Sequence, residues 1–220
     1  MKKDKKISIL LLGLIILYTI SFLISNIITI KQIILPFGIT MTSAVILFPI
    51  VYILSDVFSE VYGYRWSRNT RYIAFASNLF MVLIFTIVIN LPSASTFTGQ
   101  EALIQILGST PKVLFASLLA YLIGDFVNDK IFAKMKEKHT DTKGFGIRAI
   151  VSSAVGELVD SLIFLPIAFL GLMPISTLAV MTICQVFIKT GYEVIILPVT
   201  TKLVKWVKKL EGDRYDEWNV

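Results

Sequence analysis

Six long apolar runs constrain the fold of this chain more than any other feature of its sequence. A helix rises about 1.5 Å per residue, so roughly 20 apolar residues cross a hydrocarbon core of about 30 Å. The runs cover about residues 8–28, 38–62, 71–91, 111–133, 148–170 and 175–200. They predict an all-α integral membrane protein with six transmembrane helices, organised as a single domain over residues 1–220.

The composition agrees with a membrane protein. Hydrophobic residues make up 55% of the chain, charged residues 16%, and the mean hydropathy is +0.78. Soluble domains carry about 25% charged residues and could not bury this much apolar surface. The single cysteine, Cys184, excludes an intramolecular disulfide. The first run is too long for the apolar region of a signal peptide, and no small-residue cleavage site follows it, so we expect it to remain as the first span.

The basic residues predict the orientation of the chain. Eighteen of the 21 Lys and Arg residues fall at the N-terminus, after the second span, between the fourth and fifth spans, and in the C-terminal tail. Positively charged loops are retained in the cytoplasm, so both termini are predicted to be cytoplasmic. The loop after the second span is predicted to hold Arg65, Arg68 and Arg71. Because the positive charge is explained by topology, nucleic acid is not expected as a partner.

The longest segment predicted on the external side runs from Leu91 to Thr110. It is rich in Ser and Thr and contains a short apolar stretch at residues 102–107. A lid or a re-entrant helix is an alternative here, but we favour a loop.

Acidic residues lie inside four of the predicted spans, where each charge costs about 2.5–3.5 kcal/mol at the centre of the membrane. They occur three or four residues apart, so that each pair shares one helix face. The pairs are Asp56 and Glu60 on the second span, Asp125 and Asp129 on the fourth, and Glu157 and Asp160 on the fifth, while the sixth span carries Lys189 and Glu193 with Gln185 one turn earlier.

These charges predict a polar site inside the membrane. Seven acidic residues lie within the spans, and Lys189 is the single base away from the span ends, so ion pairing alone cannot neutralise them. Some must be protonated, bind a cationic or donor-rich ligand, or line a wet cavity, and such a cavity in a helical bundle is typical of a transport route. The alternative is that they are interfacial charges or structural pairs, which applies best to Glu60 and Asp129. The substrate-binding candidates are Glu157, Asp160, Lys189, Asp56, Asp125, Gln185 and Glu193.

No catalytic motif accompanies these carboxylates. The chain lacks His-Glu-x-x-His, Gly-x-Ser-x-Gly and a phosphate-binding Gly-x-x-x-x-Gly-Lys-Ser/Thr. We therefore expect a protein that is not an enzyme, with no cofactor and no metal site. Aromatic side chains within the spans could stack on a planar ligand, and the sequence does not choose among Tyr52, Tyr121, Phe164 and Tyr192.

Four stretches of the sequence carry a family resemblance. They are Ser55–Gly63 with Arg68 following, Gly124–Phe132, Gly156–Ser161 leading to Phe164 and Ala168-Phe169, and Lys189 with Glu193 and Pro198. In this order and on these spans they resemble the queuosine precursor transporters, also called the vitamin uptake transporter family. Some members carry Gln at the position of Asp125 and Asp at that of Asn128, so the fourth span departs from their pattern.

The resemblance implies uptake of 7-deazaguanines (preQ0, preQ1 or queuine) across a bacterial inner membrane. The N–H donors of a guanine-like edge suit a buried carboxylate, because charge assistance makes such hydrogen bonds about twice as strong as neutral ones. We expect Glu157 or Asp160 to bind this edge, and Asp56 and Asp125 to hold the amine of preQ1 or to carry a coupling proton. Lys189 or Gln185 would donate to the carbonyl oxygen. Besides this substrate the expected partners are membrane lipids, and a homodimer is left open.

Two alternatives stay open. The substrate-binding subunit of an energy-coupling-factor transporter is also a small six-helix protein, but it typically presents small residues such as Ala on its first helix. The first span here contains no Ala and only Gly13. A membrane enzyme or assembly factor with a polar core is the other alternative; an enzyme would need a catalytic motif, and an assembly factor would not bind a deazapurine.

Overall fold

The computed structural model describes residues 7–138 and 145–212, and helices dominate this part of the chain. The helices are α1 (Ile9–Ile28), α2 (Phe48–Val57) with the π-helical turn η3 (Phe58–Tyr62), α3 (Gly63–Asn90), the short α4 (Gln100–Leu107), α5 (Thr110–Lys138), α6 (Phe145–Phe169) and α7 (Ile175–Glu211). Among the described residues, four helical stretches are long and apolar enough to cross a membrane: Ile9–Ile28, Arg65–Asn90, Gln100–Gly124 and Ile175–Glu211. The chain is therefore a helical, multi-pass membrane protein.

The region predicted as the second span is the one that differs most from a continuous helix. A small antiparallel hairpin lies directly before this region and includes its first residues. Its strands are β1 (Gln32–Leu35) and β2 (Ile39–Thr42), and the 3₁₀ turn η1 (Pro36–Gly38) connects them. A second 3₁₀ turn, η2 (Ser43–Ile46), leads into α2. The β-branched residues of β1 and β2 favour extended structure, which an apolar count alone does not register.

No loop separates the second helical region from α3. The turn η3 continues α2, and Gly63, with a φ of +80°, redirects the chain at once into α3. Glycine adopts this conformation without the steric cost that a Cβ would bring. The prediction of a loop containing Arg65, Arg68 and Arg71 is therefore wrong, because all three lie within α3. Arg71 sits about two turns from the start of this helix.

The segment predicted to lie on the external side is also more ordered than predicted. A helix, α4, occupies the stretch Gln100–Leu107 that we expected to belong to a loop. The side chain of Gln100 ties it to the end of α3 by donating a hydrogen bond to the carbonyl oxygen of Ile89 at 2.9 Å. No residue of α4 is buried, so this helix projects from the bundle.

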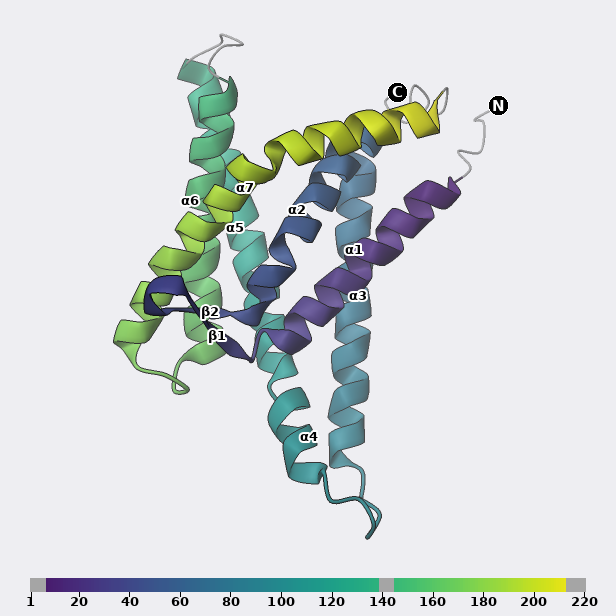
Figure 1. The fold of residues 1–220 in the computed structure, drawn as a ribbon, viewed down its shortest axis with the longest axis vertical. Helices are drawn as coiled ribbons and strands as arrows, with labels where there is room; N and C mark the ends of the chain where they lie inside the picture. The colour runs from purple at the N-terminus through teal and green to yellow at the C-terminus, as the bar shows by residue number, and fades with distance from the viewer. Residues whose placement is uncertain (1–6, 139–144, 213–220) are drawn as a thin grey trace.

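The long helices α1, α3, α5, α6 and α7, together with α2, alternate in direction, while the short α4 runs the same way as α5 (Figure 1). One end of the bundle holds the first residues of α1 and α6 and the last residues of α7. The short α4 lies at the opposite end. α5 and α6 run side by side, and α7 changes direction partway so that its last turns cross the ends of α2 and α3. Pro198 lies inside α7, and a proline removes a backbone hydrogen bond and kinks a helix. Several basic residues predicted to be cytoplasmic (the lysines at 2–6, Lys143 and Arg214) lie outside the described residues.

The last turns of α7 are fastened to the start of α1. Glu211 is only 6% exposed, and its carboxylate accepts hydrogen bonds from the hydroxyls of Ser8 at 2.5 Å and Tyr62 at 2.8 Å. Ser8 also caps α1 by accepting from the backbone N–H of Leu11. A carboxylate at a helix N-terminus interacts favourably with the helix dipole. The neighbouring apolar cluster includes Val204 and Val207 of α7 with Leu11, Leu54, Val57 and Phe58.

α5 and α6 are closely packed at Gly124, and this contact yields a first prediction. A Cβ at this position would lie 3.0 Å from the carbonyl oxygen of Gly156 and 3.2 Å from the Cβ of Asp160. Gly124→Val should force the two helices apart and lower the free energy of unfolding by about 1–3 kcal/mol. Thermal unfolding of the purified protein in detergent measures this. Gly13→Val is the matched control, since nothing lies within 4 Å of its added Cβ; an equal loss of stability in both variants would contradict the prediction.

Candidate functional site

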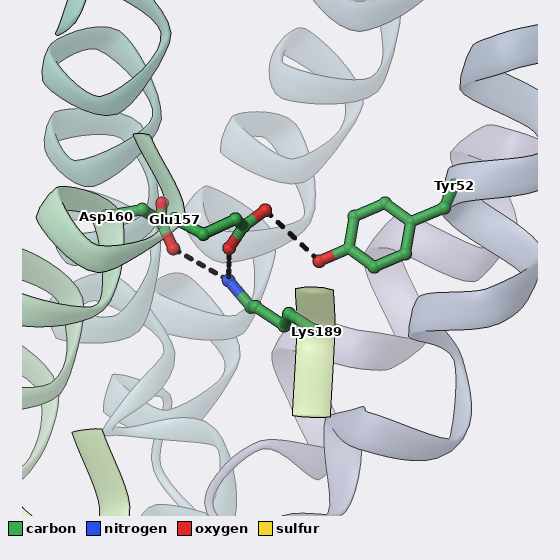
Figure 2. A network of polar contacts seen from close by, with 4 residues as sticks. All are labelled: Tyr52, Glu157, Asp160 and Lys189. Atoms are coloured by element: carbon green, nitrogen blue, oxygen red, sulfur yellow. Dashed lines mark hydrogen bonds and ion pairs between the residues drawn. The ribbon is translucent and has the colours of Figure 1, made fainter. Parts of the chain in front are cut away.

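Lys189 of α7 lies between two carboxylates of α6. Its Nζ is 2.6 Å from Oε2 of Glu157 and 2.8 Å from Oδ2 of Asp160 (Figure 2). The two acids are three residues apart on one helix, so both reach the same point. Lys189 is 6% exposed. Two carboxylates face one ammonium group, and the cluster therefore carries a formal charge of −1.

α2 supplies the third side of this cluster. The hydroxyl of Tyr52 donates a hydrogen bond of 3.3 Å to Oε1 of Glu157, and Figure 2 shows it approaching from the side opposite to α6. One turn earlier, the ring centroid of Phe48 lies 5.3 Å from Nζ of Lys189, a cation–π contact. Three helices thus meet through polar and aromatic contacts at one buried ammonium group.

The cluster lines a cavity of about 740 Å³ inside the bundle. Pockets that bind small molecules commonly measure about 300–1,000 Å³. One wall is aromatic: the ring centroids of Phe22 and Phe75 are 5.1 Å apart, and those of Phe75 and Tyr121 are 5.4 Å apart. The wall formed by α6 and α7 carries the ion-paired cluster. A planar molecule with apolar faces and a polar edge matches this combination.

Five of the seven predicted binding residues line this cavity: Asp56, Glu157, Asp160, Gln185 and Lys189. Gln185 is 2% exposed, and its Oε1 has no hydrogen-bond partner among the described residues. Buried acceptors are nearly always paired, so this oxygen is a candidate ligand contact. The other two predicted residues, Asp125 and Glu193, belong to α5 and α7, but their side chains lie outside the described part of the structure.

Glu60 belongs to a different place. Its Oε1 lies 2.7 Å from Nζ of Lys208 in an exposed ion pair near the end of α7, which fits the interfacial alternative. The side chain of Asp129 lies outside the described residues. Within residues 7–138 and 145–212, the described side chains form no group of three or more His, Cys, Asp or Glu residues that could hold a metal ion.

Two parts of the cavity wall were missed from the sequence. Arg71 lines the cavity, with its guanidinium carbon 5.4 Å from the ring centroid of Tyr121. It belongs to α3 and not to the predicted loop. Ser25 and Asn26 of α1, and Thr29 directly after its end, also line the cavity. These polar residues lie close together at the end of an otherwise apolar run, and this pattern could have indicated a polar contact inside the bundle.

Of the four aromatic candidates, Tyr52, Tyr121 and Phe164 line the cavity, and Tyr192 is not among its lining residues.

Comparisons with known proteins agree on one family. A family model described as "Putative vitamin uptake transporter" matches residues 42–203. A Bacillus subtilis protein named "Probable queuosine precursor transporter" is 28% identical over 162 residues, which cover 74% of this chain and 71% of that protein. A Haemophilus influenzae protein of the same name is 25% identical over 123 residues, or 56% of this chain and 49% of that protein. No solved structure matches the chain.

The ion-paired cluster leads to a second prediction. Lys189→Met leaves two partly buried carboxylates without their counter-ion, and breaking a buried pair in this way costs about 3–5 kcal/mol. We expect a value near the lower end, because the side chain of Asp160 is 27% exposed. Thermal unfolding of purified protein in detergent provides the measurement.

The matched control adds Glu157→Gln and Asp160→Asn to Lys189→Met. This triple variant has no charge left to compensate, so it should recover most of the lost stability. If the triple variant is as unstable as Lys189→Met alone, packing of the lysine stem rather than charge explains the loss.

Proposed function

Because the chain belongs to the vitamin uptake transporter family, we propose that it takes up queuosine precursors, the 7-deazaguanines preQ0, preQ1 or queuine, across a bacterial inner membrane. The names and bacterial origins of both relatives support this proposal. The structural observation that carries it is the Glu157–Asp160–Lys189 cluster on the wall of a cavity large enough for such a base.

The chemistry of the cluster suits a guanine-like edge. Glu157 and Asp160 provide charged acceptors for adjacent N–H groups, and the unpartnered Oε1 of Gln185 provides a neutral one. An ammonium group has three donors; Lys189 donates a hydrogen bond to Asp160 and forms an ion pair with Glu157. A further N–H of Lys189 would donate to the carbonyl oxygen of the base. Lys189 would therefore hold the two acids in place and contact the ligand as well.

We further propose six membrane crossings with both termini in the cytoplasm. The alternating helix directions and the common end shared by the start of α1 and the end of α7 support an even number of crossings (Figure 1). The hydrogen bond between Ser8 and Glu211 supports the same arrangement. Exposed lysines on the last turns of α7, Lys202, Lys205 and Lys209, lie at that end and fit the cytoplasmic side.

Transport by the purified chain alone tests the function. Proteoliposomes should take up labelled preQ1 above the level of protein-free liposomes, and preQ0 and queuine should compete where adenine does not. Uptake without any added ATPase subunit would also exclude the energy-coupling-factor alternative. Glu157→Gln and Asp160→Asn should each lower uptake about 10-fold or more, since a hydrogen bond to a charged group is lost. Glu60→Gln, outside the cavity, is the control; undiminished uptake in both site variants would refute the assignment.

Cysteine labelling tests the topology. In a background with Cys184→Ser, Ser95→Cys lies in the exposed segment between α3 and α4, and Lys205→Cys lies on the exposed face of the last turns of α7. A membrane-impermeant maleimide should label Ser95→Cys in right-side-out membrane vesicles and label Lys205→Cys only after permeabilisation. The opposite pattern would reverse the orientation, and labelling of both positions before permeabilisation would exclude an odd number of crossings between them.

A further inference from the structure

The charged residues on the cavity wall leave one carboxylate without a counter-ion. Of the described lining residues, Asp56, Glu157 and Asp160 are acidic, and Arg71 and Lys189 are basic. Lys189 is occupied by the two acids of α6. Within the described part of the chain, Asp56 makes no ion pair or hydrogen bond. The side chain of Asp56 is exposed on the cavity surface, so a cationic group of a ligand inside the cavity can reach this carboxylate.

The position of Asp56 relates it directly to the ion-paired cluster. Phe48, Tyr52 and Asp56 follow one another at intervals of four residues, so they share one face of α2, and all three line the cavity. Phe48 contacts Lys189, and Tyr52 donates to Glu157. Asp56 comes one turn later, about 6 Å further along the helix. The wall therefore presents two acidic points: the ion-paired cluster, which Tyr52 contacts, and Asp56, which lies one turn after Tyr52 on α2.

Gln185 gives independent evidence for a ligand at the first of these points. It lines the same cavity from α7, is 2% exposed, and its Oε1 has no hydrogen-bond partner among the described residues. A donor edge of a ligand would satisfy this oxygen together with the carboxylates of α6. A ligand bound there extends toward Asp56 if it carries a substituent opposite its donor edge.

We propose that the site selects a planar base bearing a positive charge, with its donor edge at Glu157, Asp160 and Gln185 and its cationic substituent at Asp56, and that the membrane potential drives its uptake. This inference rests on the proposed function and narrows the substrate class. The aminomethyl group of preQ1 is a cation at neutral pH, whereas preQ0 carries a neutral nitrile in its place. Asp56 then binds substrate and does not carry a coupling proton.

A membrane potential of ordinary size is sufficient to accumulate a cationic base inside the cell. One positive charge that moves inward across an inside-negative potential of about 100 mV reaches an equilibrium accumulation of about 50-fold. A neutral base gains nothing from the same potential. Comparing the accumulation of preQ1 with that of preQ0 therefore distinguishes a carrier that selects for positive charge from one that recognises only the guanine-like edge.

The test uses the full chain in proteoliposomes with a valinomycin-imposed potassium diffusion potential. Labelled preQ1 should accumulate up to about 50-fold at about 100 mV, while preQ0 should only equilibrate. Asp56→Asn should lower preQ1 uptake about 10-fold or more relative to preQ0 uptake, because only the cation loses a partner. Retained preQ0 uptake shows that this variant is folded. Glu60→Gln is the matched control: it removes an acid of the adjoining turn, which pairs with Lys208 outside the cavity, and should leave the ratio unchanged.

Several results would overturn the inference. These are preQ1 uptake that does not respond to the potential, an equal loss of both compounds in Asp56→Asn, and an unchanged ratio in that variant. Uptake of both compounds driven equally by a pH gradient would show proton coupling and would also overturn the inference. If neither compound enters liposomes with the wild-type protein, the proposed function itself fails; if both enter without discrimination by charge, only this inference fails.

Discussion

An ammonium group buried among apolar helices is stable only beside carboxylates, and the arrangement around Lys189 follows from that requirement. The lysine on α7 is held by Glu157 and Asp160 of α6, and Tyr52 of α2 bonds to the first of these acids. Gly124 of α5 has no side chain to separate α5 from α6 at Asp160. Four helices are thereby positioned around one charged cluster, and removing one partner leaves an uncompensated charge.

The same requirement explains why the bundle contains a cavity. Two acids and one base need polar surroundings beyond one another, and the 740 Å³ space beside them supplies room for water or a ligand. The aromatic wall of Phe22, Phe75 and Tyr121 offers apolar surface in the same cavity. This contrast between an aromatic wall and a charged wall is suited to a planar base. At one end of the bundle, Glu211 of α7 accepts hydrogen bonds from Ser8 and Tyr62.

Much of the helical framework was predictable, because hydropathy and helix rise are local properties of a segment. The first apolar run, 8–28, corresponds to α1, and the run 111–133 lies within α5. Other features were not predictable in this way. The hairpin at Gln32–Thr42 is as apolar as a membrane-spanning helix, so hydropathy does not distinguish the two. The helix α7 continues to Glu211 because its last turns bury Val204 and Val207 against α1 and α2 while their lysines are exposed. Arg71 lies in α3 and not in a loop, because the chain turns at Gly63 and enters α3 directly.

The sequence by itself determined that this chain is a membrane protein with acids paired on helix faces, since both properties depend only on residues close together in the chain. Only the tertiary structure decided which charges meet. Lys189 lies 29 residues from Asp160 in the chain, and Tyr52 lies 105 residues from Glu157. No local pattern specifies such contacts, because they depend on how the helices pack. The same packing leaves Asp56 in the cavity without a partner among the described residues and joins Glu60 to Lys208 outside it.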